Sequence, residues 1–239
     1  RLGVVNFFNP MVEAPPIYQS VTYLTSTPVR QVTMQVEHGQ YAFYVAEGNQ
    51  NTVEKFVLKP DSTSGARAGN PFIPASVTTN GVTCALSAPW GLTSIPTTSR
   101  IAVISTAASG RLSIYDQDGN CVAHLTGGTL GAGTPIAVAY HAQADKLLVT
   151  FATSHAIYAF PADGSSNAGT LVYQNSAIIN TPRAITTDSD GNIYVGSVGT
   201  DTIEKLTWTG TGLATLATSG PLIRNSIFTA NPTSITVIP

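Results

Sequence analysis

Charged residues are scarce in this chain of 239 residues: Lys and Arg number 11, Asp and Glu number 13, and together they form 10% of the sequence. The net charge of -2 gives too weak and mixed a field to attract a polyanion, so nucleic acid is not expected as a partner. No apolar stretch approaches the roughly 20 residues of a membrane-spanning helix. A transmembrane segment is therefore not expected either.

Cysteine is also rare, since the chain has only Cys84 and Cys121. Their spacing matches no metal motif and fits either one disulfide or two buried thiols. With few charges, the surface must consist mostly of Thr, Ser, Asn, Gln and Ala, a composition that suits an extracellular or periplasmic setting. The chain begins at Arg1 rather than at a methionine, which fits a processed chain, and we expect export.

Signatures of catalysis are missing as well. The sequence has no Gly-x-Ser-x-Gly elbow, no phosphate-binding loop and no haem attachment site. No pair of its four histidines has the spacing of a zinc site. The residues therefore identify no reaction, and they favour a binding protein over an enzyme.

The sequence does contain a repeat that begins with proline. Each copy has a proline, an apolar run, a polar turn and a second apolar run. The copies start at Pro28, Pro89, Pro135 and Pro182, and a fifth from Pro232 runs to the last residue. Apart from one longer first interval, the period is roughly 40 to 50 residues, which is typical of the blades of a β-propeller.

The fourth copy shows the strands of one repeat most clearly. β-branched and aromatic residues alternate between turns rich in Gly, Asp and Asn, which predicts four short antiparallel strands. These are Pro182–Thr187, Ile193–Ser197, Thr202–Leu206 and Leu213–Ala217. Asp190-Gly191 forms the first turn, where glycine tolerates a positive φ.

The other copies fit the same template. Their second strands are predicted at Tyr41–Val45, Ile101–Ile104 and Leu147–Thr150, and their third strands at Thr52–Phe56, Leu112–Tyr115 and Ala156–Phe160. The longer first interval is interpreted as a polar surface loop at Lys59–Pro71.

We therefore expect an all-β fold in which residues 1–239 form a single five-bladed β-propeller of four-stranded antiparallel blades. The fifth blade combines a first strand from Thr233–Pro239 with strands at Leu2–Phe8, Ile17–Ser20 and Val21–Leu24. Pairing of the two termini would close the ring and protect the exposed strand edges. Six blades are the alternative if the inserted region contains further strands.

The segment Asp188-Ser-Asp-Gly-Asn-Ile-Tyr-Val195, followed by Ile203-Glu-Lys205, resembles the repeats of NHL-type and gluconolactonase-like propellers. The resemblance supports the propeller fold. For an enzyme of the gluconolactonase type it implies a divalent cation, such as calcium, held by Glu47, Asn49 and Asp201. A metal-dependent lactonase is therefore the alternative function, and no other cofactor is expected. The Asp188 segment itself is interpreted as a turn that caps its own backbone, because it lacks the remaining ligands of a calcium loop.

In such propellers the loops that lead into each first strand, and those between second and third strands, open onto one face around the central channel. The ligand-binding candidates on this face are Arg30, Trp90, Arg183, Asn49 and His155. Two guanidinium groups and an aromatic wall suit a carboxylate, a sugar or a peptide. Alternatively, Arg30 and Arg183 pair with Glu47 and Asp201 and hold the blades together.

These observations lead to one hypothesis about function. The chain is expected to be a secreted or periplasmic propeller that acts as a binding or scaffolding module. Its partner is a protein or a carbohydrate that contacts the loop face.

Overall fold

A computed structural model describes residues 5–7, 19–21, 29–58, 65–69, 71–106, 110–126, 130, 133–210, 212–215, 222–223 and 235. Nearly all regular structure in these residues is β-strand, with one 3-10 turn at Pro96–Thr98. No helix in the described part of the chain is long and apolar enough to cross a membrane.

Most strands belong to four antiparallel sheets, which follow one another along the chain and are called blades 1 to 4 here. Blade 1 has β3 (Val29–Glu37), β4 (Gln40–Glu47), β5 (Thr52–Leu58) and β6 (Gly65–Arg67). Blade 2 has β9 (Pro89–Ile95), β10 (Arg100–Ser105), β11 (Arg111–Tyr115) and β12 (Cys121–Thr126). Blade 3 has β13 (Pro135–His141), β14 (Lys146–Phe151), β15 (Ala156–Pro161) and β16 (Thr170–Gln174). Blade 4 has β17 (Pro182–Thr187), β18 (Asn192–Ser197), β19 (Thr202–Trp208) and β20 (Leu213–Thr215).

The prolines of the repeat mark the first strand of three blades, because β9, β13 and β17 begin at them. In blade 1 the first strand begins one residue after the proline, at Val29. Val29 pairs with Glu47 in the same way that Pro89 pairs with Ser105. The structural repeat of blade 1 therefore begins at Val29 rather than at Pro28.

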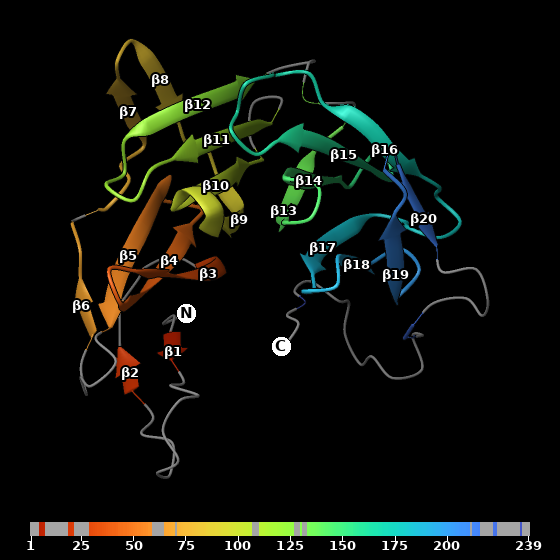
Figure 1. The fold of residues 1–239 in the computed structure, drawn as a ribbon, viewed down its shortest axis with the longest axis horizontal. Helices are drawn as coiled ribbons and strands as arrows, with labels where there is room; N and C mark the ends of the chain where they lie inside the picture. Colours follow the sequence, from red (N-terminus) through yellow and green to blue (C-terminus); the bar gives the residue numbers. More distant parts are fainter. Residues whose placement is uncertain are drawn as a thin grey trace.

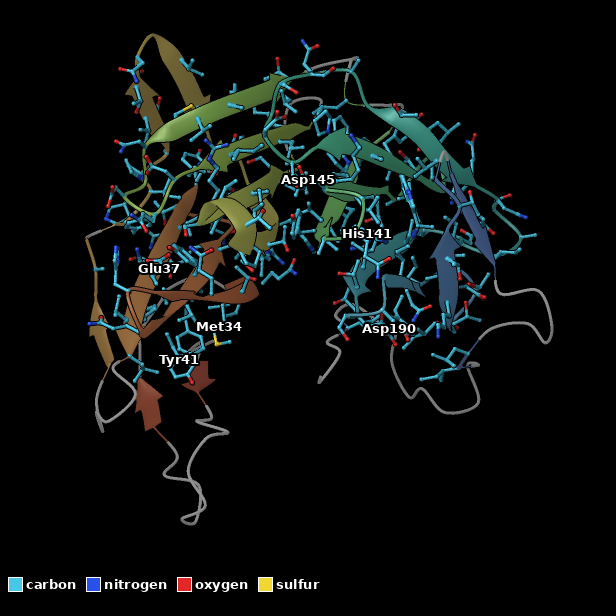
Figure 2. The ribbon with its side chains drawn as sticks, viewed as in Figure 1. Met34, Glu37, Tyr41, His141, Asp145 and Asp190 are labelled. Carbon is cyan, nitrogen blue, oxygen red and sulfur yellow. A yellow bond between two sulfur atoms is a disulfide. The ribbon has the colours of Figure 1, made fainter. Side chains whose placement is uncertain are left out.

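The four blades form an arc in which β3, β9, β13 and β17 lie next to one another in that order on the inner side (Figure 1). Side chains fill the spaces between neighbouring blades (Figure 2). This is the arrangement of a β-propeller, in which a sheet that cannot bury both of its faces alone packs against the next sheet.

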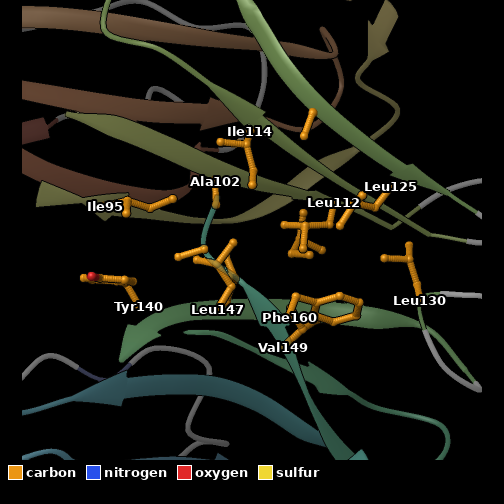
Figure 3. Packing of buried hydrophobic residues seen from close by; sticks show 14 of the residues in the cluster. Ile95, Ala102, Leu112, Ile114, Leu125, Leu130, Tyr140, Leu147, Val149 and Phe160 are labelled. Atoms are coloured by element: carbon orange, nitrogen blue, oxygen red, sulfur yellow. The ribbon is translucent and has the colours of Figure 1, made fainter. Parts of the chain in front are cut away.

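The apolar core is accordingly divided into clusters between blades. Between blades 2 and 3, buried residues such as Ile114, Leu112, Val149 and Phe160 pack together (Figure 3). A second cluster joins blade 1 to blade 2 and a third joins blade 3 to blade 4. Close approach also requires a glycine, since a Cβ atom at Gly91 would lie 2.6 Å from the carbonyl oxygen of Ile136.

The prediction that the longer first interval contains only a polar surface loop at residues 59–71 is wrong. Residues 59–71 include β6, the outer strand of blade 1, and the extra length lies further on. It forms a hairpin of β7 (Ser76–Thr79) and β8 (Val82–Ala85), which pair in a two-stranded sheet of their own. The turn at Asn80 and Gly81 has positive φ at both residues, as the tightest hairpin turns require.

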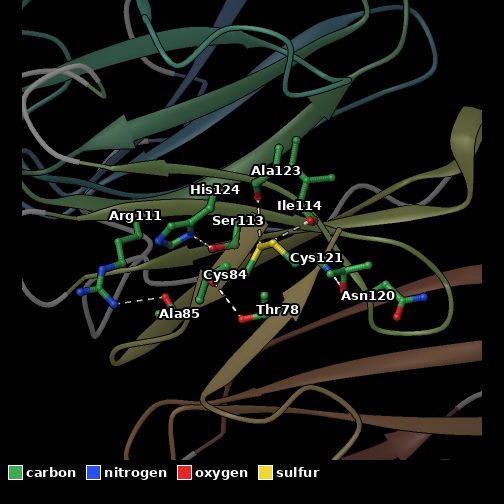
Figure 4. Close-up of a disulfide and its surroundings, with 12 residues drawn as sticks. Thr78, Cys84, Ala85, Arg111, Ser113, Ile114, Asn120, Cys121, Ala123 and His124 are labelled. Carbon is green, nitrogen blue, oxygen red and sulfur yellow. Dashed lines mark hydrogen bonds between the residues drawn. A yellow bond between two sulfur atoms is a disulfide. The ribbon is translucent and has the colours of Figure 1, made fainter. Parts of the chain in front are cut away.

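A disulfide between Cys84 in β8 and Cys121 in β12 holds this hairpin against blade 2 (Figure 4). Both cysteines are buried, and the backbone N–H of Cys121 donates to Oγ1 of Thr79 at 3.2 Å. Of the two alternatives that the sequence left open, the structure therefore contains the disulfide.

At the N-terminus, β1 (Val5–Phe7) pairs antiparallel with β2 (Gln19–Val21). β1 falls within the predicted strand Leu2–Phe8, whereas β2 spans the boundary between the two strands predicted after it. The remainder of the predicted fifth blade, including Thr233–Pro239 apart from Ile235, lies outside the described residues. The described strands form no closed sheet.

Candidate functional site

The inner strands of all four blades surround a central cavity of about 250 Å³. The cavity is lined in part by apolar side chains, one from each inner strand and one from the C-terminal segment. These are Val32, Leu92, Val138, Ile185 and Ile235. Strand pairing puts the first four in equivalent positions, each opposite a valine of the second strand of its blade. Ile235 follows Pro232 at the same interval at which Leu92 follows Pro89.

A second set of equivalent residues lies nearer the start of the inner strands, two positions before Val32, Leu92 and Ile185. It consists of Arg30, Trp90 and Arg183, which are called the mouth here. Each directly follows the first residue of its strand, and the corresponding residue of blade 3 is Ile136. All three mouth residues line one small cavity, which has about 10 Å³ of free space and also touches Ile235. The structure therefore brings these three candidates together, with room for about one water molecule between them.

The guanidinium of Arg30 stacks on the indole ring of Trp90, with Cζ 4.1 Å from the ring centroid. Gly48 leaves space for this stack, because a Cβ atom there would lie 3.0 Å from Nε of Arg30. Arg30 is exposed, whereas Trp90 and Arg183 are half-buried. Stacking uses the flat face of a guanidinium and leaves the N–H groups at its edge available.

The alternative prediction, in which Arg30 and Arg183 pair with Glu47 and Asp201, stays a prediction for Glu47. Among the described residues, Arg183 forms no ion pair with Asp201. Glu47 ends β4 and is only 1% exposed. The mouth brings two cationic groups to one small cavity.

His155, another ligand-binding candidate, makes a contact between blades. It precedes β15 with a φ of 53°, and its Nδ1 accepts a hydrogen bond from the backbone N–H of Thr181 at 3.0 Å. Thr181 directly precedes Pro182, the first residue of blade 4. His155 therefore links the loop before the third strand of blade 3 to the start of blade 4.

The same link joins blades 1 and 2 through Asn51, which the sequence analysis did not single out. Asn51 precedes β5 with a φ of 58°, and its Oδ1 accepts from the backbone N–H of Ala88 at 2.6 Å. Asp201 has the equivalent position before β19 and a φ of 51°. A polar residue directly before the third strand of blades 1, 3 and 4 is the sequence signal for this link, whereas blade 2 has Gly110 there.

The described residues contain no group of three or more His, Cys, Asp and Glu side chains that could hold a metal ion. Of the predicted cation ligands, Glu47 is buried, Asn49 is an exposed turn residue and Asp201 occupies the linking position. The cation site stays a prediction from residue types.

The segment around Asp188 is a turn that caps itself, as interpreted from its sequence. Oδ1 of Asp188 accepts from the backbone N–H of Asn192 at 2.8 Å, and Oδ2 accepts from the hydroxyl of Tyr194 at 2.9 Å. Partial burial alone would raise the pKa of Asp188, but these hydrogen bonds outweigh it and lower the pKa below its usual value.

Sequence analysis also missed a buried cluster between blades 1 and 2. Nζ of Lys55 lies 2.7 Å from a carboxylate oxygen of Glu37 and donates to the carbonyl of Gln117 at 2.7 Å. Gln35 and Tyr44 donate to the same carboxylate. Burial alone would raise the pKa of Glu37, but these hydrogen bonds and the Lys55 charge lower it overall. The cluster is enclosed, so it stabilises the interface between blades rather than forming a binding site.

Comparisons with known proteins give similarity of structure alone. No protein-family model and no curated protein matches the sequence. A chain from a nidogen/laminin complex is 10% identical, with a TM-score of 0.46 over 92% of this chain and 91% of that one. A catalytically inactive virginiamycin B lyase from Staphylococcus aureus, solved with quinupristin, is 13% identical, with a TM-score of 0.48 over 94% and 77%.

A protein of unknown function from Bacteroides thetaiotaomicron is 14% identical, with a TM-score of 0.46 over 80% of this chain and 44% of that one. At these identities and TM-scores, none of the three structures bears on what this chain binds. The propeller class rests on the blades themselves, and the candidate site rests on the mouth.

Proposed function

We propose that the chain is a five-bladed β-propeller in which the segment from Pro232 supplies the first strand of the fifth blade. The position of Ile235 supports this proposal. It lies in the cavity together with Val32 of β3 and Ile185 of β17, the inner strands at the two ends of the arc. A strand at this position would join blade 4 to blade 1.

The free face of β3 gives independent support. Val32, Met34 and Val36 are 38%, 46% and 62% exposed. The residues of β3 that alternate with these three face blade 2. One of them is Gln31, whose Oε1 accepts a hydrogen bond from the backbone N–H of Leu92 at 3.1 Å.

In the other blades the face equivalent to that of Val32 packs against the preceding blade. Leu92, Val138 and Ile185 are only 1%, 1% and 4% exposed. A fifth blade, built from the C-terminal strand and from strands that include β1 and β2, would cover the corresponding apolar face of blade 1.

The proposed function of this propeller is binding at the mouth. Three side chains from different blades converge there, and this convergence carries the proposal. The disulfide and the scarcity of charge favour an extracellular or periplasmic setting. Of the two ligand classes expected, protein is favoured over carbohydrate, because Arg30 already covers one face of Trp90 on which a sugar ring could stack.

Selection of peptides from a displayed random library tests this function. Peptides selected on the intact protein should lose binding to Trp90→Ala and keep binding to Trp208→Ala. Trp208 is the other tryptophan of the chain and lies at the end of β19. Melting curves of both variants should first establish that each is folded. Selected peptides that bind Trp90→Ala as tightly as the intact protein would show that the mouth is not the ligand face.

A further inference from the structure

The cationic character of the mouth narrows the ligand class, and the following inference rests on the proposed function. Arg30 and Arg183 line the same small cavity although they come from opposite ends of the arc. One ligand group can therefore reach both guanidinium groups. An anion at this point would meet two of the 11 basic residues of a charge-poor chain.

The stack on Trp90 orients Arg30 for a flat partner. Cζ of Arg30 lies 4.1 Å from the ring centroid of Trp90. A guanidinium that stacks on an aromatic face in this way keeps its N–H edge available to a ligand. This edge matches the two oxygens of a carboxylate in a bidentate pair. Because the stack restricts the side chain before binding, less conformational entropy is lost when the pair forms.

The floor of the cavity favours a carboxylate over a phosphate. Apart from Gln31 and the mouth itself, the floor is lined by Ala137, Ala184, Ile185 and Ile235. These four side chains offer no donors, so only Gln31 and the two guanidinium groups could pair with the additional oxygens of a phosphate. A carboxylate presents only two oxygens, and both can pair with the guanidinium edges.

We infer that the mouth binds the carboxylate of an acidic side chain on a protein partner, held between Arg30 and Arg183 at the edge of Trp90. The free space of about 10 Å³ is too small to enclose a carboxylate, so the carboxylate would pair with the guanidinium groups at the opening of the cavity and the remainder of the partner would lie on the surrounding loops. Asn49 in the exposed turn after β4 is one such loop residue.

A capped tetraglutamate peptide is the probe for this inference. In a ¹H–¹⁵N spectrum it should shift the indole N–H signal of Trp90, whereas a capped tetraglutamine peptide should not. Titration calorimetry at low ionic strength should give a Kd that rises by about tenfold to hundredfold in Arg30→Gln and in Arg183→Gln, since each variant removes charge-assisted hydrogen bonds. Added salt should weaken binding to the intact protein.

Arg100→Gln is the matched control, because Arg100 begins β10 at the end of its blade away from the mouth. It should bind tetraglutamate as the intact protein does. Arg30→Lys separates geometry from charge: it keeps the cation but loses the planar fork, so it should bind more weakly than the intact protein. Equal Kd values for the intact protein and both glutamine variants of the mouth would overturn the inference.

The remaining outcomes separate this inference from the proposed function. If tetraglutamine shifts the Trp90 signal as strongly as tetraglutamate, the mouth is a binding site and the carboxylate assignment is wrong. If D-glucuronate binds at least as tightly as tetraglutamate, the carboxylate assignment stands and the protein source is wrong. If no probe shifts Trp90 and no displayed peptide depends on it, both the inference and the proposed function fail.

Discussion

Replacing Lys55 with methionine tests whether the buried cluster stabilises the interface between blades 1 and 2. The side chains of Lys55 and Glu37 are only 9% and 8% exposed, and Nζ also donates to the carbonyl of Gln117 in blade 2. Methionine has a similar length but leaves the carboxylate of Glu37 buried without its cation. Removing one partner of a buried ion pair costs about 3–5 kcal/mol, which corresponds to a fall in Tm of roughly 10 °C for a domain of this size.

The repeat supplies a matched control for this variant. Lys205 stands in β19 where Lys55 stands in β5, and both follow a glutamate, but Lys205 is half-buried. Its Nζ lies 5.7 Å from the ring centroid of Tyr194. Lys205→Met should cost less than about 1 kcal/mol. Urea unfolding at pH 7 measures both variants, and equal losses of stability would refute the role assigned to Lys55.

The pH dependence of the Lys55→Met variant follows from the pKa of Glu37. Burial opposes ionisation, but hydrogen bonds from Lys55, Tyr44 and Gln35 lower the pKa below its ordinary value of 4.5. A lowered pKa in the folded state gives stability that is present above the unfolded pKa and lost as pH falls through the folded pKa. Without Lys55, the pKa of Glu37 rises because less opposes the effect of burial. Protonation then removes the buried charge that destabilises the variant. The deficit of the variant should therefore shrink on acidification, and a deficit independent of pH would contradict this explanation.

Three further variants test other parts of the fold. Replacing Cys84 and Cys121 with serine should lower the free energy of unfolding by about 3–4 kcal/mol, the loop entropy expected for their separation of 37 residues. In urea unfolding, a reducing agent should lower the free energy of unfolding of the intact protein by the same amount. Gly91→Ala should cost about 1–3 kcal/mol in the same assay, because its Cβ would lie 2.6 Å from the backbone of β13. Asp201 has the position at which Asn51 and His155 link neighbouring blades, so we expect it to link blade 4 to the fifth blade. Asp201→Gly keeps the positive φ but removes this acceptor, and it should cost about 1 kcal/mol. His38→Gly is its control, since His38 has a φ of 48° in an exposed turn, and equal melting temperatures for these two glycine variants would argue against the link.

The strands of the repeat could be predicted because their signals are local. The alternation in Pro182–Thr187 and the turn at Asp190 and Gly191 are sufficient to define β17 and the turn that follows it. Trp90 and Arg183 directly follow the prolines of their copies, so their equivalence follows from the repeat alone. Arg30 is two residues after Pro28, and its equivalence depends on the pairing of Val29 with Glu47. The convergence of all three on one cavity then depends only on the blades being arranged around an axis.

The features that the sequence left open or that were missed depend on contacts distant in sequence. The pairing of Cys84 with Cys121 requires the hairpin to fold back on blade 2, and spacing alone does not decide this. Lys55 pairs with Glu37 because two blades enclose both side chains, and the Glu-Lys pair that Lys55 shares with Lys205 does not predict this partner. The hairpin did carry a local signal in Asn80-Gly81, but its Thr-rich strands have too little apolar alternation to resemble a blade.

The central claim, that the C-terminal segment closes the ring, is tested most directly by nuclear Overhauser effects from the methyl groups of Ile235. In protein with labelled methyl groups, Ile235 should show cross-peaks to Val32 of blade 1 and to Ile185 of blade 4 in the same sample. Both cross-peaks should disappear when residues 233–239 are deleted, and the truncated protein should melt at a lower temperature. Cross-peaks to one blade alone, or to neither, would contradict a closed five-bladed ring.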